Sequence, residues 1–98
     1  MNIHSVKMLL IKKIIMDTKQ KYVRLKKYNS FIFFPMIIEH STFKHLDPIS
    51  AGFCYLDEDQ VVKCFGSSFS LGLNSIPEED TKLATKQVYG IDAMLALI

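Results

Sequence analysis

The feature that most constrains the fold is an alternation of side chains with a period of two, which recurs between residues 22 and 73. A β-strand sends successive side chains to opposite faces, whereas a helix repeats about every 3.6 residues. Turn-forming residues interrupt the alternation at Asn29-Ser30, at Asp47-Pro48 and in the polar run 57–60. The pattern therefore predicts short strands joined by turns, which is typical of an antiparallel sheet.

The first two strands are expected to form a hairpin. Residues 22–27 fit an edge strand with one partly wet face, because basic and apolar side chains alternate there. Residues 31–38 fit a buried strand in which Pro35 marks a bulge, an edge position or the end. Residues 40–46 then favour one or two helical turns capped by Ser41.

A second hairpin is predicted from strands over 49–56 and 61–65, and a half-buried strand over 68–73 follows it. Cys54 and Cys64 fall on the two arms of this hairpin. A loop of two or four residues would place them on opposite faces, whereas a loop of three would make them direct neighbours. Two inert buried thiols are the favoured interpretation, and the spacing predicts no metal site.

A helix should complete the domain. Ser75 and Glu78 have the spacing of a capping box, with Ser75 as N-cap, and Gly90 is a natural C-terminal stop. The sequence therefore predicts an α+β domain over 16–98, in which an antiparallel sheet of four to five strands packs on a C-terminal helix. Residues 1–15 are either a short amphipathic helix or an extension outside the domain.

The length of 98 residues suits one domain, and the longest apolar runs fall far short of the roughly 20 residues that cross a bilayer. With two cysteines and no signal-like segment, we expect a cytoplasmic protein without membrane contact. No glycine-rich phosphate loop occurs, and no cofactor is expected.

Charge is divided unevenly between the halves. Residues 1–49 hold nine Lys and Arg against three Asp and Glu, or +6, and residues 50–98 hold three against seven, or −4. This asymmetry is typical of a polyanion-binding face, of head-to-tail pairing between copies, or of solvated faces without a partner. A nucleic-acid site would use a basic strip with interleaved aromatic residues: Lys19, Lys21, Tyr22, Arg24, Lys26, Lys27 and Tyr28. The same lysines also suit an edge strand that resists aggregation.

A hydrolase-like enzyme is a further alternative, with His40 as base and Cys64 or Ser70 as nucleophile. The string around Ser70 lacks the first glycine of a nucleophile elbow, so the sequence favours a non-enzymatic protein.

The stretch from His40 through 50–53 and 64–73 to 75–80 resembles small uncharacterised proteins encoded in bacterial and prophage genomes. The resemblance covers about residues 31–90 and implies a phage or bacterial setting without an activity.

The leading hypothesis is a small protein-interaction module that associates with itself as a homodimer or larger homo-oligomer. The tail 91–98 is too apolar to be left in water, so it packs on its own domain or on a partner. The candidate interface residues are Ile91, Met94, Leu95, Leu97 and Ile98.

Overall fold

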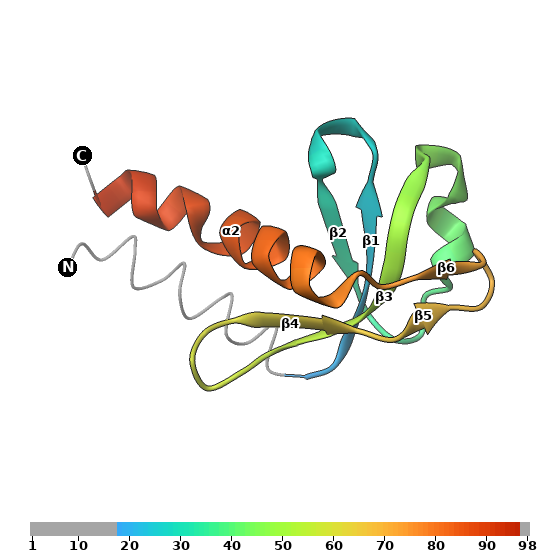
Figure 1. The fold of residues 1–98 in the computed structure, drawn as a ribbon, viewed down its shortest axis with the longest axis horizontal. Coiled ribbons are helices and arrows are strands. Elements are labelled where there is room, and N and C mark those ends of the chain that lie inside the picture. Colours follow the sequence, from blue (N-terminus) through green and yellow to red (C-terminus); the bar gives the residue numbers. More distant parts are fainter. Residues whose placement is uncertain (1–17, 97–98) are drawn as a thin grey trace.

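The protein has an α+β fold, as the sequence predicts (Figure 1). The structure is a computed structural model that describes the backbone of residues 18–96 and the side chains of residues 18–90. The expected N-terminal helix over 1–15 and the interface residues Leu97 and Ile98 lie outside the described residues. The elements are β1 (Gln20–Leu25), the 3₁₀ turn η1 (Lys27–Asn29), β2 (Phe31–Phe34), the 3₁₀ segment η2 (His40–Leu46), β3 (Pro48–Leu56), β4 (Val62–Phe65), β5 (Ser67–Ser68), β6 (Leu73–Asn74) and α2 (Pro77–Ala96).

The main sheet has four antiparallel strands in the order β2-β1-β3-β4. Both expected hairpins are confirmed, and the first strand of the second sheet follows β4 directly. The expectation that β1 is an edge strand with a wet face is wrong, because β1 pairs on both sides. Its two cationic side chains are buried and have partners. The Lys21 ammonium donates to the Ile38 carbonyl at 2.9 Å, and the Arg24 guanidinium donates to the Asp80 carboxylate. Lys21 and Arg24 therefore lie on opposite faces of β1 without facing water.

Each face of the sheet carries its own apolar core. The face under α2 buries Tyr22, Phe31, Cys54, Val62, Cys64 and Ala84. The opposite face buries Val23, Phe34 and Ala51, which pack against Phe43 of η2 and against residues of the β5–β6 hairpin. The protein therefore has three layers, with α2 on one side of the sheet and η2 with the small sheet on the other.

The β3–β4 hairpin has the three-residue loop that makes its cysteines neighbours. Asp57 donates its amide to the Val61 carbonyl at 3.0 Å, which leaves residues 58–60 as the loop. Gln60 closes it with a positive φ of 62°, the left-handed conformation typical of such hairpins. Cys54 and Cys64 are consequently direct partners in the ladder.

Two local expectations are wrong. Residues 68–73 do not form one strand: β5 and β6 are two short antiparallel strands, and residues 69–72 make the turn between them. Gly72 supplies a φ of 64° there, which favours a turn over a continuous strand. Likewise Ser41 does not cap η2, whose N-cap residue is Glu39 without a side-chain cap bond.

The beginning and the end of α2 also differ from expectation. The Ile76 carbonyl accepts the Asp80 amide at 2.7 Å, so Ile76 and not Ser75 precedes the first turn. The carboxylate that reaches back to the Ile76 amide belongs to Asp80, at 3.0 Å, and not to Glu78. The helix also passes through Gly90 to Ala96, because a glycine inside a helix costs only about 1 kcal/mol.

Helix α2 makes hydrogen bonds to the outer edges of both edge strands. On β4, the Thr81 and Thr85 hydroxyls accept the amides of Cys64 and Val62, each at 2.9 Å. On β2, the Gln87 side chain accepts the Phe31 amide at 2.7 Å and donates to the Phe31 carbonyl at 2.9 Å. The sheet is therefore curled far enough for one helix to contact both of its edges.

Candidate functional site

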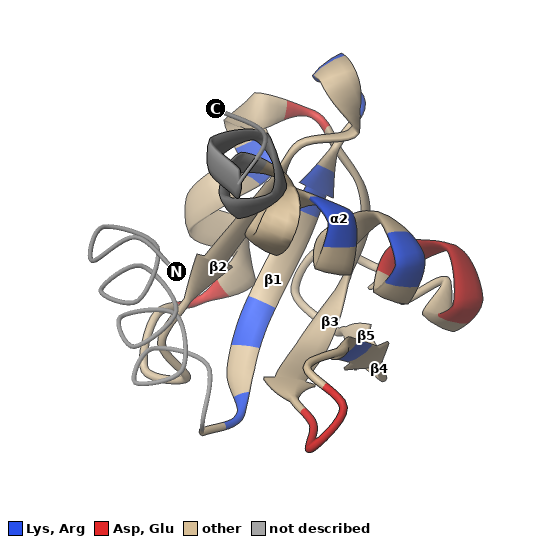
Figure 2. Ribbon diagram, turned by 90° about the vertical axis from the view of Figure 1, so that its left-hand side faces the viewer, with Lys and Arg blue, Asp and Glu red and all other residues tan. Residues whose placement is uncertain are grey.

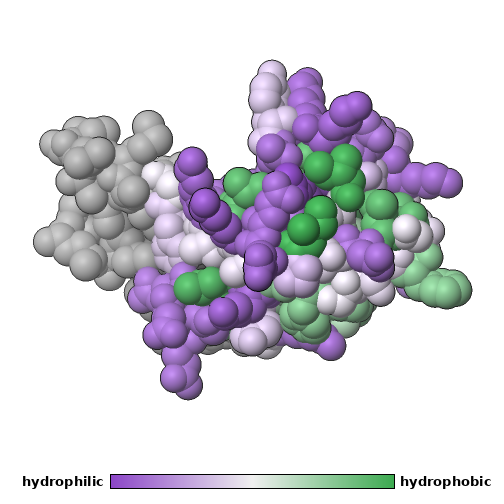
Figure 3. All heavy atoms as spheres, viewed as in Figure 1, coloured by the Kyte–Doolittle hydropathy of each residue, from purple (hydrophilic) through white to green (hydrophobic). Residues whose placement is uncertain are grey.

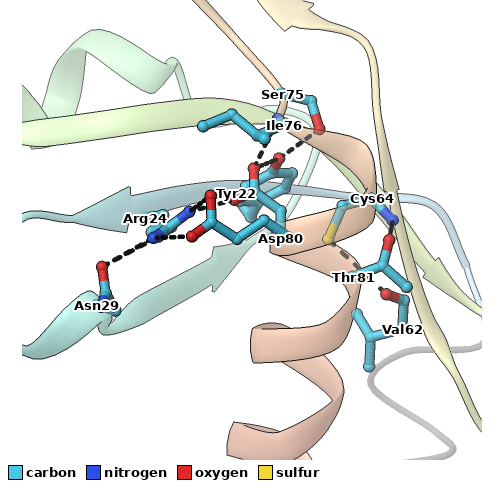
Figure 4. Close-up of polar contacts among 10 residues, drawn as sticks. Tyr22, Arg24, Asn29, Val62, Cys64, Ser75, Ile76, Asp80 and Thr81 are labelled. Carbon is cyan, nitrogen blue, oxygen red and sulfur yellow. Dashed lines mark hydrogen bonds and ion pairs between the residues drawn. The ribbon is translucent and has the colours of Figure 1, made fainter.

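A cluster of buried polar side chains joins β1 to the first turn of α2 (Figure 4). Tyr22 and Asp80 have no exposed surface, and the Tyr22 hydroxyl donates to the Asp80 carboxylate. The Tyr22 and Ser75 hydroxyls share a second hydrogen bond of 2.6 Å. Burial raises the pKa of Tyr22 above its ordinary value, and the bond to Asp80 raises it further. Tyr22 is therefore a neutral hydrogen-bond donor and not a proton-transfer group.

Arg24 occupies the other side of Asp80 and is only 4% exposed. Its Nη1 donates to Asp80 Oδ1 at 2.9 Å and lies 3.2 Å from Glu79 Oε2. Its Nε and Nη2 donate to Asn29 Oδ1 at 3.2 and 2.9 Å. The hydrogen bond that Arg24 donates to the Glu79 carboxylate contributes most to raising the pKa of Arg24. Because Tyr22, Arg24 and Asp80 are buried and bonded to one another or to Asn29 and Glu79, the cluster anchors α2 to β1.

His40 is buried on the face of the sheet opposite α2. Its Nε2 lies 2.9 Å from the Gly52 carbonyl oxygen, and its ring meets the rings of Phe34 and Phe53 edge-on at 5.4 and 5.9 Å. Desolvation lowers the pKa of His40 below its ordinary value. His40 is therefore a neutral donor inside an aromatic pocket.

This burial of His40 predicts a loss of stability in mild acid. Below the ordinary histidine pKa of about 6.5, the unfolded chain binds a proton that the folded chain resists. The stabilisation is complete above that pH and is lost as the pH falls toward the lowered folded pKa, at no more than about 1.4 kcal/mol per pH unit. Urea unfolding at pH 7.5 and pH 5.5 should show a larger decrease for the natural chain than for His40→Gln. Equal decreases in the two proteins would contradict the assignment.

The three candidate catalytic residues do not come together. Cys64 lies under α2 with Cys54, whereas His40 lies across the sheet against Phe53, whose side chain alternates with that of Cys54. Ser70 lies in the exposed turn between β5 and β6. Burial raises the pKa of each cysteine thiol to about 12. Neither thiol therefore has His40 as a neighbouring base, and the raised pKa values disfavour the reactive thiolate form.

The basic strip of residues 19–28 is not a continuous surface. Lys21, Tyr22 and Arg24 are buried and hydrogen-bonded inside the domain. The remaining four are exposed, but β1 separates Lys19 at its start from the group at its end, which consists of Lys26, Lys27 and Tyr28. Six residues of strand span about 20 Å, so no single short stretch of nucleic acid meets both groups without crossing the covered strand.

Sequence analysis missed an exposed aromatic cluster on the face opposite α2. Phe53 and Phe65 are cross-strand partners with ring centroids 5.9 Å apart, and the Tyr55 and Phe65 rings are also 5.9 Å apart. The Lys19 ammonium lies 5.1 Å from the centre of the Phe53 ring. The register that pairs Cys54 with Cys64 places these aromatic side chains together, so the choice of a three-residue loop would have revealed the cluster.

Surface chemistry elsewhere is mixed. Figure 2 shows acidic residues at the first turn of α2 and at the turn between β3 and β4. Figure 3 shows hydrophobic residues in several separate groups, with hydrophilic residues between them. Within residues 18–96, no group of three or more His, Cys, Asp or Glu side chains is arranged to hold a metal ion. No helix in that part of the chain is long and apolar enough to span a bilayer.

A scan against protein-family models, a search of curated proteins and a search of solved structures each found no match to this chain. The structure itself shows a small α+β domain in which one helix packs across a four-stranded antiparallel sheet.

Proposed function

We propose that the protein is a small interaction module that associates with a second copy of itself through the C-terminal part of α2. The observation that supports this proposal is the length of the helix. Residues 79–87 of α2 hydrogen-bond to the sheet and Val88 packs in the core beneath it, yet the helix continues to Ala96. Figure 1 shows this last part extending beyond the sheet.

The sequence of the extension favours an apolar contact. Residues 91–98 contain one charged residue, Asp92, among Ile, Ala, Met and Leu. Val88 still packs against the core under α2. A helix adds 1.5 Å per residue, so residues 91–96 extend the helix by about 9 Å beyond Gly90. An apolar helical segment of this kind is stabilised by packing against a second helix, and a second copy supplies an identical one.

The edges of the sheet support self-association less than the sequence alone indicates. Both edge strands are engaged by α2 through Thr81, Thr85 and Gln87. The support for a nucleic-acid-binding protein is also weaker, because Tyr22 and Arg24 of the basic strip are buried inside the domain and cannot contact nucleic acid. A cytoplasmic location and a bacterial or prophage setting remain parts of the proposal.

The test is light scattering coupled to size exclusion at micromolar concentration. The natural chain is expected to elute as a dimer, and a Met94→Lys/Leu95→Lys double variant as a monomer, because two cations cannot be buried without partners. Tyr55→Ser is the matched control, since it changes the exposed aromatic cluster on the other face and should leave the dimer intact. A monomeric natural chain, or a dimer lost only in Tyr55→Ser, would overturn the proposal.

A further inference from the structure

We propose that Cys54 and Cys64 form a redox-active dithiol site, which a small-molecule disulfide such as glutathione disulfide oxidises to a cross-strand disulfide. The two residues are direct partners in the β3–β4 ladder, and both side chains lie in the core under α2. Both are free thiols in the structure. The site depends on β3 and β4 and not on the proposed self-association.

The backbone around Cys64 identifies the type of pair. Its amide donates to the Thr81 hydroxyl on α2, at 2.9 Å, and therefore points away from β3. In an antiparallel ladder, such a residue belongs to a pair without mutual hydrogen bonds, whose Cα atoms lie about 4.5 Å apart. Disulfides join Cα atoms about 4.4–6.8 Å apart, so the two strands already have a separation that a disulfide accepts.

Closure of the bond requires side-chain rotation more than backbone movement. The Cys64 thiol lies 3.8 Å from the Val62 carbonyl oxygen of its own strand, to which it donates. Rotation of the Cys64 side chain about its Cα–Cβ bond would break this weak contact and turn the Cys64 sulfur toward the Cys54 sulfur. Because the strand separation already falls within the disulfide range, closure needs no displacement of β3 or β4.

Access to the thiols depends on α2. Cys54 is fully buried, Cys64 nearly so, and Ala84 of the helix packs in the same cluster. A thiolate is the attacking species in disulfide exchange, and burial keeps both thiols protonated. Oxidation therefore requires α2 to move away from β4, and the rate of oxidation reports how often the helix does so.

The reaction balances with glutathione disulfide as the oxidant. One cysteine thiolate attacks a sulfur of glutathione disulfide, forms a mixed disulfide and releases one glutathione thiolate. The second cysteine thiolate then attacks the protein sulfur of the mixed disulfide and releases the second glutathione. Two S–H bonds are lost and one S–S bond forms, and the two protons go to the two glutathione molecules.

The test is intact-mass measurement on the full chain, incubated with glutathione disulfide without denaturant and then quenched in acid. The expected product is about 2 Da lighter, carries no glutathione and has no free thiol, and dithiothreitol should reverse it. Cys54→Ser should stop at the stage of the mixed disulfide. Thr81→Val should oxidise faster, because it removes the acceptor that holds β4 to α2.

Three results would overturn the inference. The first is that the native chain keeps both thiols while the same chain in urea is oxidised. The second is that the main product is a disulfide-linked dimer. The third is that the mixed disulfide accumulates and the intramolecular disulfide does not form.

Discussion

Replacing Asp80 by alanine is expected to lower the free energy of unfolding by about 3–5 kcal/mol, because it leaves the Arg24 guanidinium buried without its buried counter-ion. The same change removes the acceptor of the Tyr22 hydroxyl and of the Ile76 amide. A domain of this size has a total stability of only about 5–15 kcal/mol, so the variant should be only marginally folded. Urea unfolding followed by circular dichroism measures the change.

Asp80→Asn gives a second measurement if the alanine variant does not fold. It keeps the volume and one acceptor oxygen but removes the charge, so it should destabilise less than Asp80→Ala and clearly more than the controls.

Two matched controls separate this effect from general sensitivity. Glu79→Ala removes a carboxylate that also contacts Arg24, but its side chain is 54% exposed and solvent screens it, so the cost should stay below about 1 kcal/mol. Ser50→Ala removes a buried hydroxyl that has no hydrogen-bond partner among the described residues, and it should be neutral or slightly stabilising. If Asp80→Ala cost no more than Glu79→Ala, the buried ion pair would not anchor the helix.

Substitutions by alanine at two glycines should change stability in opposite directions. At Gly52, an added Cβ would lie 2.4 Å from the Phe65 carbonyl oxygen and 3.3 Å from the Ser75 Cβ. The backbone of β3 or the segment after β4 must move, at a cost of about 1–3 kcal/mol or more. At Gly90, an added Cβ meets nothing within 4 Å, and the residue lies inside α2.

Gly90→Ala should therefore stabilise the protein by about 0.5–1 kcal/mol, since alanine is the better helix former. The measurement is the thermal unfolding midpoint of each variant, compared with that of the natural chain. A destabilised Gly90→Ala would show that the helix does not continue through this position in solution, and an unchanged Gly52→Ala would contradict the close approach of the backbone.

The strand order shows where sequence reasoning stops. The period of two located β1, β2, β3 and β4, because alternation is a local property of the chain. It did not place β1 at the centre, since the lysine and arginine in β1 look like solvent-facing residues until their partners are known. Those partners, Ile38 and Asp80, are distant in sequence, and only the folded structure identifies them.

The start of α2 illustrates the same limit. Ser75 has the spacing of an N-cap residue, but its hydroxyl bonds to Tyr22, so a tertiary contact displaces a local one. Conversely, the neighbouring position of the two cysteines was among the sequence alternatives, and the loop length alone decided it. The exposed aromatic cluster followed from that same register.

The contacts of α2 with both edge strands have a consequence for misfolding. When the helix detaches, the amides of Val62 and Cys64 on one edge and the polar groups of Phe31 on the other lose their partners together. A sheet with two open edges can add strands from other molecules at both ends, which is the geometry of cross-β fibrils. We therefore expect α2 to protect the protein from fibril growth, and changes that weaken its anchor to shorten the lag time of aggregation.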